Sequence, residues 1–347
     1  MKRHLLFIAA LLIVNLAVSA QKKFSVYAVG FYNQENLFDT CHDEGKKDYE
    51  YLPNKGWNGM KYTNKLRNMS KALADMGTDV LPNVGCAFIG LSEVENHKVL
   101  DALVDQAPLK ARNMKYVHIE GPDRRGIDCA LLYNPSLFSV KNVKLLPYVQ
   151  ELAKDSAFFT RGFLTVRGEM AGDDVAVIVC HWPSRFSGPF YRESAARQVK
   201  VIKDSLLNVN QEMKIFVMGD MNDDPVNKSM HVYLQAKPEI SQVGAGDMYN
   251  PWYNVLAKEG KGTLFYSGNW NLFDQIVITP NLLNKDAKKK DYSSLKYWKS
   301  HIFRRDYLIQ QEGQYKGAPL RTTAGGRWLN GYSDHLPVVM YLVKEKK

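Results

Sequence analysis

Polar residues that can carry out acid–base and metal chemistry stand at the ends of short apolar runs. His181 follows the run Val175–Cys180, and Asp220 closely follows Lys214–Met218. Asp274 lies inside an apolar run, where a charged side chain is costly unless it is paired. One such stretch could be an ordinary turn, but six of them spread over three hundred residues are not expected by coincidence. They are Phe31–Asn36, Ile89–Asn96, Cys180–Arg185, Gly219–Pro225, Leu272–Ile278 and Ser333–Pro337.

The residue types in these stretches suit one kind of chemistry. Asn, Asp and Glu supply the oxygen ligands that Mg²⁺ prefers, and Mg²⁺ needs only one or two protein carboxylates. Histidines paired with acids can orient a water and stabilise developing charge on phosphorus. Asp220 and Asn222 are two residues apart, so in extended backbone they point to the same side. Because no nucleophile elbow, Walker loop or dinucleotide glycine pattern is present, the sequence predicts phosphate-ester hydrolysis by metal-activated water.

The elements that must position these residues are short strands with a few helices between them. Apolar stripes at helical spacing predict helices over Tyr62–Met76 and Ala195–Leu206. Runs of two or three strands occur between helices, which favours mixed sheets covered by helices over a strict β-α-β alternation. The predicted strands are Phe24–Phe31, Cys86–Ser92, Ile127–Tyr133, Phe163–Arg167, Val175–Cys180, Lys214–Met218, Phe273–Ile278 and Val338–Leu342.

Five motifs span most of the chain: Tyr32–Asp39, Leu91–Asn96, His181–Arg185, Gly219–Asp223 and Ser333–His335. In type and order this set resembles the motifs of the endonuclease/exonuclease/phosphatase superfamily, which has the deoxyribonuclease I-like fold. The resemblance implies a four-layer α/β sandwich, in which two packed mixed β-sheets are flanked by helices and strand ends converge on one cleft.

The resemblance also implies roles for individual residues. Glu93 matches a metal-binding glutamate with Asn33 beside it, and Asp334 matches an acidic residue that helps to hold the metal. The implied cofactor is Mg²⁺, with Mn²⁺ or Ca²⁺ as alternatives. The implied catalytic residues are His335, oriented by Asp274, together with His181, Asp220 and Asn222. Which histidine acts as base and which as acid stays open.

Further residues are predicted to bind the substrate. Arg125 and Asp128 form an element similar to one that recurs in bacterial members of the superfamily. Asn36 and Arg185 belong to two of the motifs above. All four are candidates for contacts with the phosphate ester.

The first twenty residues have the features of a signal peptide. Lys2 and Arg3 precede an apolar run, and Val18-Ser19-Ala20 supplies small residues for cleavage before Gln21. The run is shorter than the roughly 20 residues that a membrane span needs, so a single anchor is the less favoured alternative. The sequence predicts an exported protein, periplasmic or extracellular, with no stable membrane association after cleavage. Residues 21–347 are expected to form one domain, and a monomer is assumed.

The cysteine content and the distribution of charge bear on the fold class and the substrate. The chain has 347 residues, 45% of them hydrophobic, and four cysteines, which excludes a disulfide-built miniature fold. The cysteines are expected to be mostly unpaired, with one disulfide left open. The formal net charge is +10, and +8 without Lys2 and Arg3. Residues 281–332 hold seven Lys and four Arg against three Asp and one Glu, a net of +7.

This basic, aromatic-rich segment, residues 281–332, is interpreted as an insertion next to the catalytic residues. Lys288, Lys289 and Lys290 are its densest basic cluster, and interleaved aromatic residues could stack on bases. Nucleic acid, DNA or RNA, is therefore the favoured substrate. A phosphatase or phosphodiesterase acting on inositol phosphates, sugar phosphates or phospholipid headgroups is the alternative, because one fold serves many substrates. A solvated loop without a substrate role is the simpler explanation of the lysines.

Overall fold

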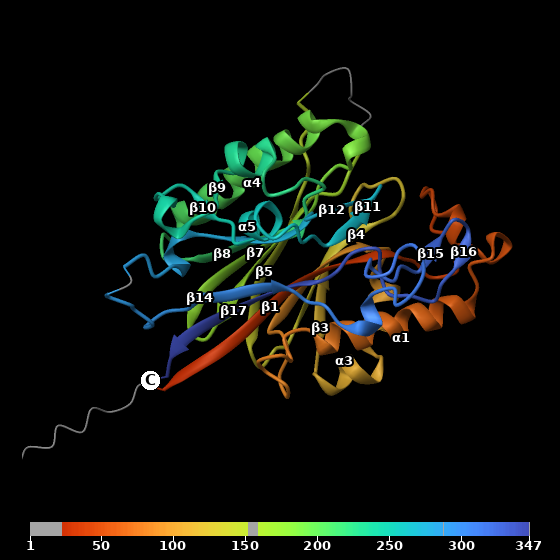
Figure 1. Cartoon of the computed structure of the whole chain (residues 1–347), viewed down its shortest axis with the longest axis horizontal. Helices are drawn as coiled ribbons and strands as arrows, with labels where there is room; N and C mark the ends of the chain where they lie inside the picture. Colours follow the sequence, from red (N-terminus) through yellow and green to blue (C-terminus); the bar gives the residue numbers. More distant parts are fainter. Residues whose placement is uncertain (1–22, 152–158, 287, 347) are drawn as a thin grey trace, which may run out of the picture.

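The computed structural model describes residues 23–151, 159–286 and 288–346, which contain two large β-sheets (Figure 1). In the first sheet, β1 (Phe24–Leu37) pairs in parallel with β2 (Phe88–Val94) and antiparallel with β17 (Val338–Glu345). All other pairs in this sheet are antiparallel. The remaining strands are β14 (Lys296–Ile302) next to β17, then β4 (Asp128–Tyr133) and β3 (Lys115–His118) beyond β2.

The second sheet is also mixed. Its central strands β7 (Asp173–His181) and β8 (Lys214–Asp220) are parallel, and β13 (Asp274–Ile278) is antiparallel to β8. The flanking strands are β5 (Phe138–Leu146) and β6 (Phe163–Met170) on one side and β10 (Met248–Tyr249) and β9 (Ala236–Lys237) on the other. Two small hairpins lie outside the sheets: β11 (Leu264–Tyr266) with β12 (Asn269–Asn271), and β15 (Thr323–Ala324) with β16 (Arg327–Trp328).

Helices cover the outer faces of both sheets. Helix α1 (Gly59–Asp75) begins after Asn58, whose side chain caps the Lys61 N–H, and buries Leu66, Met69 and Leu73 against the first sheet. Helices α2 (His97–Val104) and α3 (Ala107–Ala111) lie on that face too, and α4 (Pro189–Val209) packs on the second sheet. Short elements are α5 (Trp252–Ala257), η1 (Tyr49–Tyr51), η2 (Pro53–Lys55), η4 (Arg185–Ser187), the π-helical turn η5 (Ser229–Tyr233), η6 (Ile240–Gln242), η7 (Pro280–Leu282) and η8 (Asp306–Leu308).

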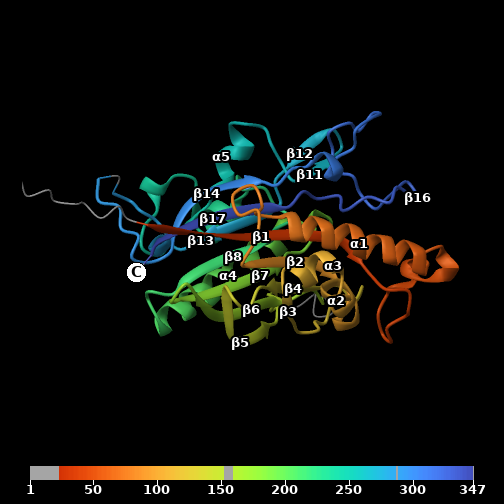
Figure 2. The ribbon, with the colours of Figure 1, turned by 90° about the horizontal axis from the view of Figure 1, so that it is seen from below.

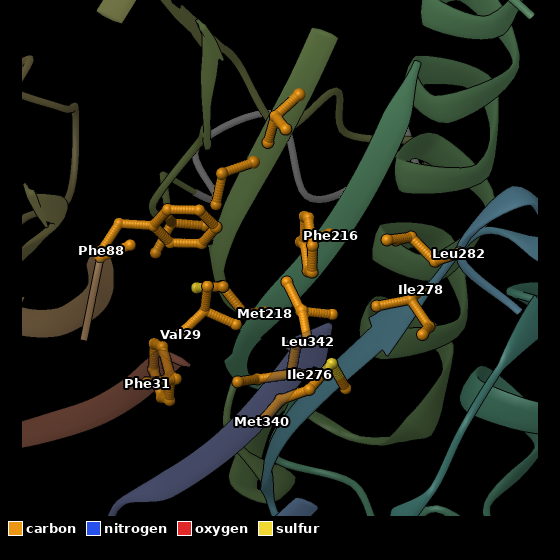
Figure 3. Close-up of a cluster of buried hydrophobic side chains, with 14 of the residues drawn as sticks. Val29, Phe31, Phe88, Phe216, Met218, Ile276, Ile278, Leu282, Met340 and Leu342 are labelled. Atoms are coloured by element: carbon orange, nitrogen blue, oxygen red, sulfur yellow. The ribbon is translucent and has the colours of Figure 1, made fainter. Parts of the chain in front are cut away.

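The main core lies between the two sheets. Along β1, Val29 and Phe31 face this core, whereas Ala28 and Tyr32 face the helices, as the two-residue period of a strand requires. Phe216 and Met218 from β8 meet them from the other sheet (Figure 3). Each sheet is therefore buried on both faces, and the layers run helix, sheet, sheet, helix. The predicted four-layer α/β sandwich of deoxyribonuclease I type is confirmed.

All eight predicted strands and both predicted helices are present, but residues 281–332 are not one unpatterned insertion. Strand β14 lies within this segment and pairs with β17 from Lys296↔Val343 to Ile302↔Val338. Part of the segment is thus an integral edge strand of the first sheet. The sequence conceals it because β14 carries polar and basic residues on its partly exposed surface.

Three smaller expectations concern export and cysteines. The predicted signal peptide, residues 1–20, lies outside the described residues. All four cysteines are described and unpaired, with Cys41 exposed and the others buried. Across residues 23–151, 159–286 and 288–346, none of the helices has the length and apolar character that a membrane span requires.

Candidate active site

The strand register brings the predicted catalytic residues to one end of the sandwich. In the second sheet, His181 on β7, Asp220 on β8 and Asp274 on β13 lie side by side in successive strands. In the first sheet, Asn33 on β1 lies next to Ser92 on β2, one residue before Glu93. The Asn33 Nδ2 atom donates to Asp220 Oδ2 at 3.0 Å, which joins the two sheets at this end.

Asp220 stands at the centre of the group. Its Oδ2 lies 3.7 Å from His181 Nε2 and 3.8 Å from His335 Nε2, while its Oδ1 accepts the Asn222 backbone N–H at 2.9 Å. Burial raises the Asp220 pKa, whereas the charge of His335 opposes that rise. Both distances are too long for direct hydrogen bonds, so the two Nε2 atoms stay available to contact a water or a phosphoryl oxygen in the cavity.

The two histidines have opposite electrostatics. His335 Nδ1 lies 2.6 Å from Asp274 Oδ2, and both side chains are buried. Burial works against a charge on His335, but the carboxylates of Asp274 and Asp220 prevail and hold its pKa well above the ordinary value. For His181, burial and then the nearby guanidinium of Arg161 hold the pKa well below the ordinary value. The surroundings therefore favour the imidazolium form of His335 and the neutral form of His181.

Glu93 provides a place for a divalent cation. Its Oε2 accepts the Asn36 N–H at 2.9 Å, and its Oε1 lies 3.8 Å from His181 Nε2. Among the described residues, no Lys or Arg lies within salt-bridge distance of this carboxylate. The Glu93 backbone adopts a φ of 58°, a left-handed conformation that a glutamate takes only under constraint, at the bulge where β2 loses register with β1.

The other two predicted metal ligands are occupied by protein contacts. Asp334 Oδ2 accepts from Arg321 Nη2 at 3.1 Å, and Asn33 Oδ1 accepts the Glu35 N–H at 2.8 Å. Within the part of the chain that the structure describes, no three His, Cys, Asp or Glu side chains are grouped so as to hold a metal alone. This donor set fits Mg²⁺, which retains several waters and is satisfied by one or two carboxylates.

These residues enclose a cavity of about 260 Å³. Glu93, His181, Asp220, Asn222 and His335 line it, so five of the predicted catalytic and metal residues meet here. Asp274 does not line the cavity but contacts Nδ1 of His335. The Asn222 Nδ2 atom donates to the Trp182 carbonyl at 2.9 Å. The predicted Arg125 also lines the cavity, with half of its side chain exposed.

Sequence reasoning missed several residues around the cavity. Arg161 lines it and is buried, with its guanidinium donating to the Trp182 carbonyl at 2.8 Å and pairing with Asp123. Its only sequence signal is a lone arginine just before the apolar run at Phe163. Ser184 and Ser187 also line the cavity and have no distinguishing pattern.

A second ionic group, formed by Arg321, Glu35 and Lys65, contacts Asp334. Arg321 bridges Asp334 and Glu35, with its Nε 3.3 Å from Glu35 Oε1. Glu35 Oε2 accepts the Thr322 N–H at 2.6 Å and lies 4.0 Å from Nζ of the fully buried Lys65. Burial lowers the Lys65 pKa to about 8. Glu35 stands two residues after Asn33, which is the one sequence signal that could have identified it.

Three predicted substrate-binding residues make contacts within the protein. The buried Asp128 carboxylate pairs with His118 Nε2 and accepts the Gly121 N–H. The Arg185 guanidinium contacts Asn271, Asp224 and Asn227 and lies over the Phe273 ring. Asn36 acts through its backbone N–H on Glu93. None of the three lines the cavity.

The predicted lysine cluster requires a correction, because Lys288, Lys289 and Lys290 lie at the opposite end of the sandwich. Nearby Tyr292 packs on Phe24 at the start of β1, and its carbonyl accepts the Glu345 N–H at the end of β17. Asn33 lies nine positions after Phe24 along this extended strand, a span of roughly 30 Å. Figures 1 and 2 show the loop before β14 near the C terminus, away from the hairpins β11–β12 and β15–β16.

The sequence profile of the Endonuclease/Exonuclease/phosphatase family matches residues 28–344. The chain belongs to this family. Because the family comprises phosphoric ester hydrolases that typically require divalent metals, the protein is an enzyme of that class. No curated protein sequence matches the chain.

Solved structures of family members have the same fold at low sequence identity. The mannosyl-6-phosphatase of Bacteroides thetaiotaomicron is 14% identical with a TM-score of 0.54, over 91% of this chain and 99% of that one. Another family protein from the same organism is 14% identical with a TM-score of 0.54, over 93% and 97%. D. rerio TDP2 in complex with a single-strand DNA product is 11% identical with a TM-score of 0.53, over 92% and 99%.

Proposed function

We propose that this enzyme hydrolyses small phosphate esters in the 260 Å³ cavity with a divalent metal held at Glu93. The observation that carries the proposal is the convergence of two histidines on Asp220 in this cavity. His335 and His181 both direct Nε2 toward the same carboxylate, at 3.8 and 3.7 Å, and their surroundings shift their pKa values in opposite directions. Such separation of pKa values within one site is typical of acid–base catalysts.

Each side chain has a step that its position supports. The oxygen of the attacking water bonds to phosphorus as Asp220 accepts a proton from that water. His335, held by Asp274, donates its Nε2 proton to the ester oxygen, which leaves as an alcohol when its bond to phosphorus breaks. Asn33 fixes the Asp220 carboxylate through the 3.0 Å hydrogen bond. Arg125 and Arg161 place positive charge beside the phosphoryl group. When bound, Mg²⁺, or Mn²⁺ or Ca²⁺ in its place, supplies Lewis-acid polarisation of a phosphoryl oxygen.

Two observations favour a small ester over a nucleic acid. The cavity has the volume of a compact group, and the Lys288–Lys290 cluster that was expected to track a polyanion lies roughly 30 Å away. Strand binding needs a basic groove along the backbone of the nucleic acid. Among the structural neighbours, the mannosyl-6-phosphatase bears a name that specifies a phosphorylated sugar. Nuclease activity is the competing outcome of the test.

The test is a panel of phosphate esters assayed in Mg²⁺ and in EDTA. It contains an aryl phosphate, a bis-aryl phosphate, a hexose phosphate, an inositol phosphate, supercoiled plasmid and RNA. We expect phosphate release from monoesters in Mg²⁺, none in EDTA and intact plasmid. Nicked plasmid with unhydrolysed monoesters would instead establish a nuclease, and activity that persists in EDTA would contradict the metal requirement.

We also propose that the enzyme is exported and acts as a soluble monomer in the periplasm or outside the cell. The apolar run and the Val18-Ser19-Ala20 sequence support this proposal. The expected mature N terminus is Gln21. N-terminal sequencing of the protein from cell fractions tests it, and a cytoplasmic protein that retains Lys2 and Arg3 would contradict it. Size-exclusion chromatography with light scattering tests the monomer.

A further inference from the structure

A groove of about 800 Å³ lies between the β11–β12 hairpin and the loop of residues 310–325. We call it the side groove. Tyr266 and Ser267 line it from the hairpin, and Gln310, Tyr315 and Arg321 line it from the loop. Its volume falls within the range of small-molecule sites, which is about 300–1,000 Å³.

The side groove lies next to the catalytic cavity at Asp334. This residue lines the groove, and its Oδ1 lies 4.0 Å from Nε2 of His335, which lines the cavity. Leu264 at the base of the hairpin forms a β-bridge with His335 itself. A phosphate ester that places its phosphoryl group at His335 would therefore have the side groove within reach of its organic group.

The walls of the groove are held in place. In the loop, Gln310 accepts the Gly317 N–H and donates to the Ala318 carbonyl, and Ile309 forms a bridge with Pro319. In the hairpin, the Phe265 ring packs against Trp270 with centroids 5.2 Å apart. Both tyrosines thus project from supported backbone. Figures 1 and 2 show hairpins β11–β12 and β15–β16 toward the end where β1 finishes.

The chemistry of the groove suits an uncharged ring that carries hydroxyl groups. Tyr266 is 69% exposed and Tyr315 is 52% exposed, so both rings are accessible to a ligand in the groove. Amide groups of Gln310 and Gln314 and the Thr323 hydroxyl can donate to and accept from hydroxyl groups. A sugar offers an apolar C–H face to an aromatic ring and hydroxyls at its rim.

Charge in the groove argues against a further phosphate. Arg321 and Asp334 are its two charged lining residues, and they pair with each other at 3.1 Å. Arg321 is also bound to Glu35. No uncommitted cation among the lining residues is left to bind an oligonucleotide or a second phosphate group.

We propose that the side groove binds the sugar of a sugar monophosphate whose phosphoryl group lies at His335. This inference rests on the proposed function and names its substrate class. Tyr266 and Tyr315 contact the ring faces, and the glutamine amides contact the hydroxyls. The groove thereby discriminates among monoesters that the cavity alone could not distinguish.

The experiment compares three monoesters: a hexose 6-phosphate, n-propyl phosphate, which lacks a ring, and a nucleoside 5′-monophosphate. The wild type should prefer the hexose phosphate in kcat/KM. Tyr266→Ala and Tyr315→Ala should each reduce that kcat/KM about tenfold, mainly through KM, and leave n-propyl phosphate unchanged. Tyr266→Phe should retain the preference. Trp298→Ala, which removes an exposed aromatic residue from β14, is the matched control and should change neither ester.

Equal rates for hexose and propyl phosphate, or no effect of either tyrosine substitution, would overturn the inference while leaving the proposed function intact. A preference for the nucleotide would overturn it as well. If no monoester is hydrolysed, the proposed function fails, and titration of the wild type with free hexose tests the groove separately. Binding that Tyr266→Ala abolishes would support the side groove as a sugar site, and absence of binding would overturn it.

Discussion

His335 Nδ1 and Asp274 Oδ2 lie 2.6 Å apart in a buried pair, and the Nε2 atom of the same ring faces Asp220. The pair keeps an imidazolium in a place where burial alone would remove its charge. It fixes which ring nitrogen faces the cavity, because the other is committed to Asp274.

Asp274→Asn should move the alkaline limb of the kcat/KM profile to lower pH. The reaction needs protonated His335, and the Asp274 carboxylate holds the His335 pKa above its ordinary value. Without that carboxylate the pKa falls, so the active form is lost at lower pH. We expect a rate about 100-fold lower at neutral pH. Asp79→Asn, which alters the surface pair of Asp79 with His301, is the control and should leave the profile unchanged. An unshifted limb in Asp274→Asn would contradict the role of the pair.

Glu93→Gln should lower activity by about 100-fold or more and raise the Mg²⁺ concentration needed for half-maximal rate. The amide can still accept the Asn36 N–H, so the fold should survive. Glu95→Gln is the matched control, because burial raises the Glu95 pKa to about 8, which favours the neutral form that glutamine resembles. Its activity and Mg²⁺ dependence should match the wild type. Equal Mg²⁺ responses in Glu93→Gln and the wild type would place the metal elsewhere.

Lys65→Met should flatten the pH dependence of stability between about pH 8 and 10.5. The folded-state pKa of Lys65 is lowered to about 8, so over this window the unfolded chain binds more protons than the native chain. The Lys65 contribution to the free energy of unfolding therefore rises with pH there. The difference between wild type and variant, measured by urea denaturation at several pH values, isolates this contribution from those of other groups. A constant difference across the window would show that the Lys65 pKa is not lowered.

Substituting Lys288, Lys289 and Lys290 together with Gln should leave kcat/KM for phosphate monoesters and its salt dependence unchanged. The cluster lies at the end of the sheets marked by Phe24 and Tyr292, beyond the range of screened charge interactions with the cavity. Arg125→Gln is the matched comparison, since Arg125 lines the cavity, and it should weaken catalysis about tenfold. A large effect of the lysine substitutions would restore the nucleic-acid interpretation.

The sequence predicts the parts of the site that sit on apolar strands. His181, Asp220 and Asp274 each belong to a run whose period identifies a buried strand, so their convergence follows from the pairing of β7, β8 and β13. Arg321 could not be predicted, because it reaches Glu35 across 286 residues of sequence and lies in no periodic element. The prediction that residues 288–290 lie beside the catalytic residues was wrong, because sequence position was taken as a guide to position in space. Their segment, residues 281–332, ends next to Ser333, but β14 carries the chain along the first sheet between the lysines and Ser333.

The most direct test of the account is phosphate release from a hexose 6-phosphate in Mg²⁺ by wild type, His335→Ala and His301→Ala. Both variants remove a histidine paired with an aspartate, at 2.6 Å in the cavity and 3.0 Å on the surface. We expect His335→Ala to lose at least about 100-fold in rate and His301→Ala to retain the wild-type rate. Equal rates for all three proteins would contradict it.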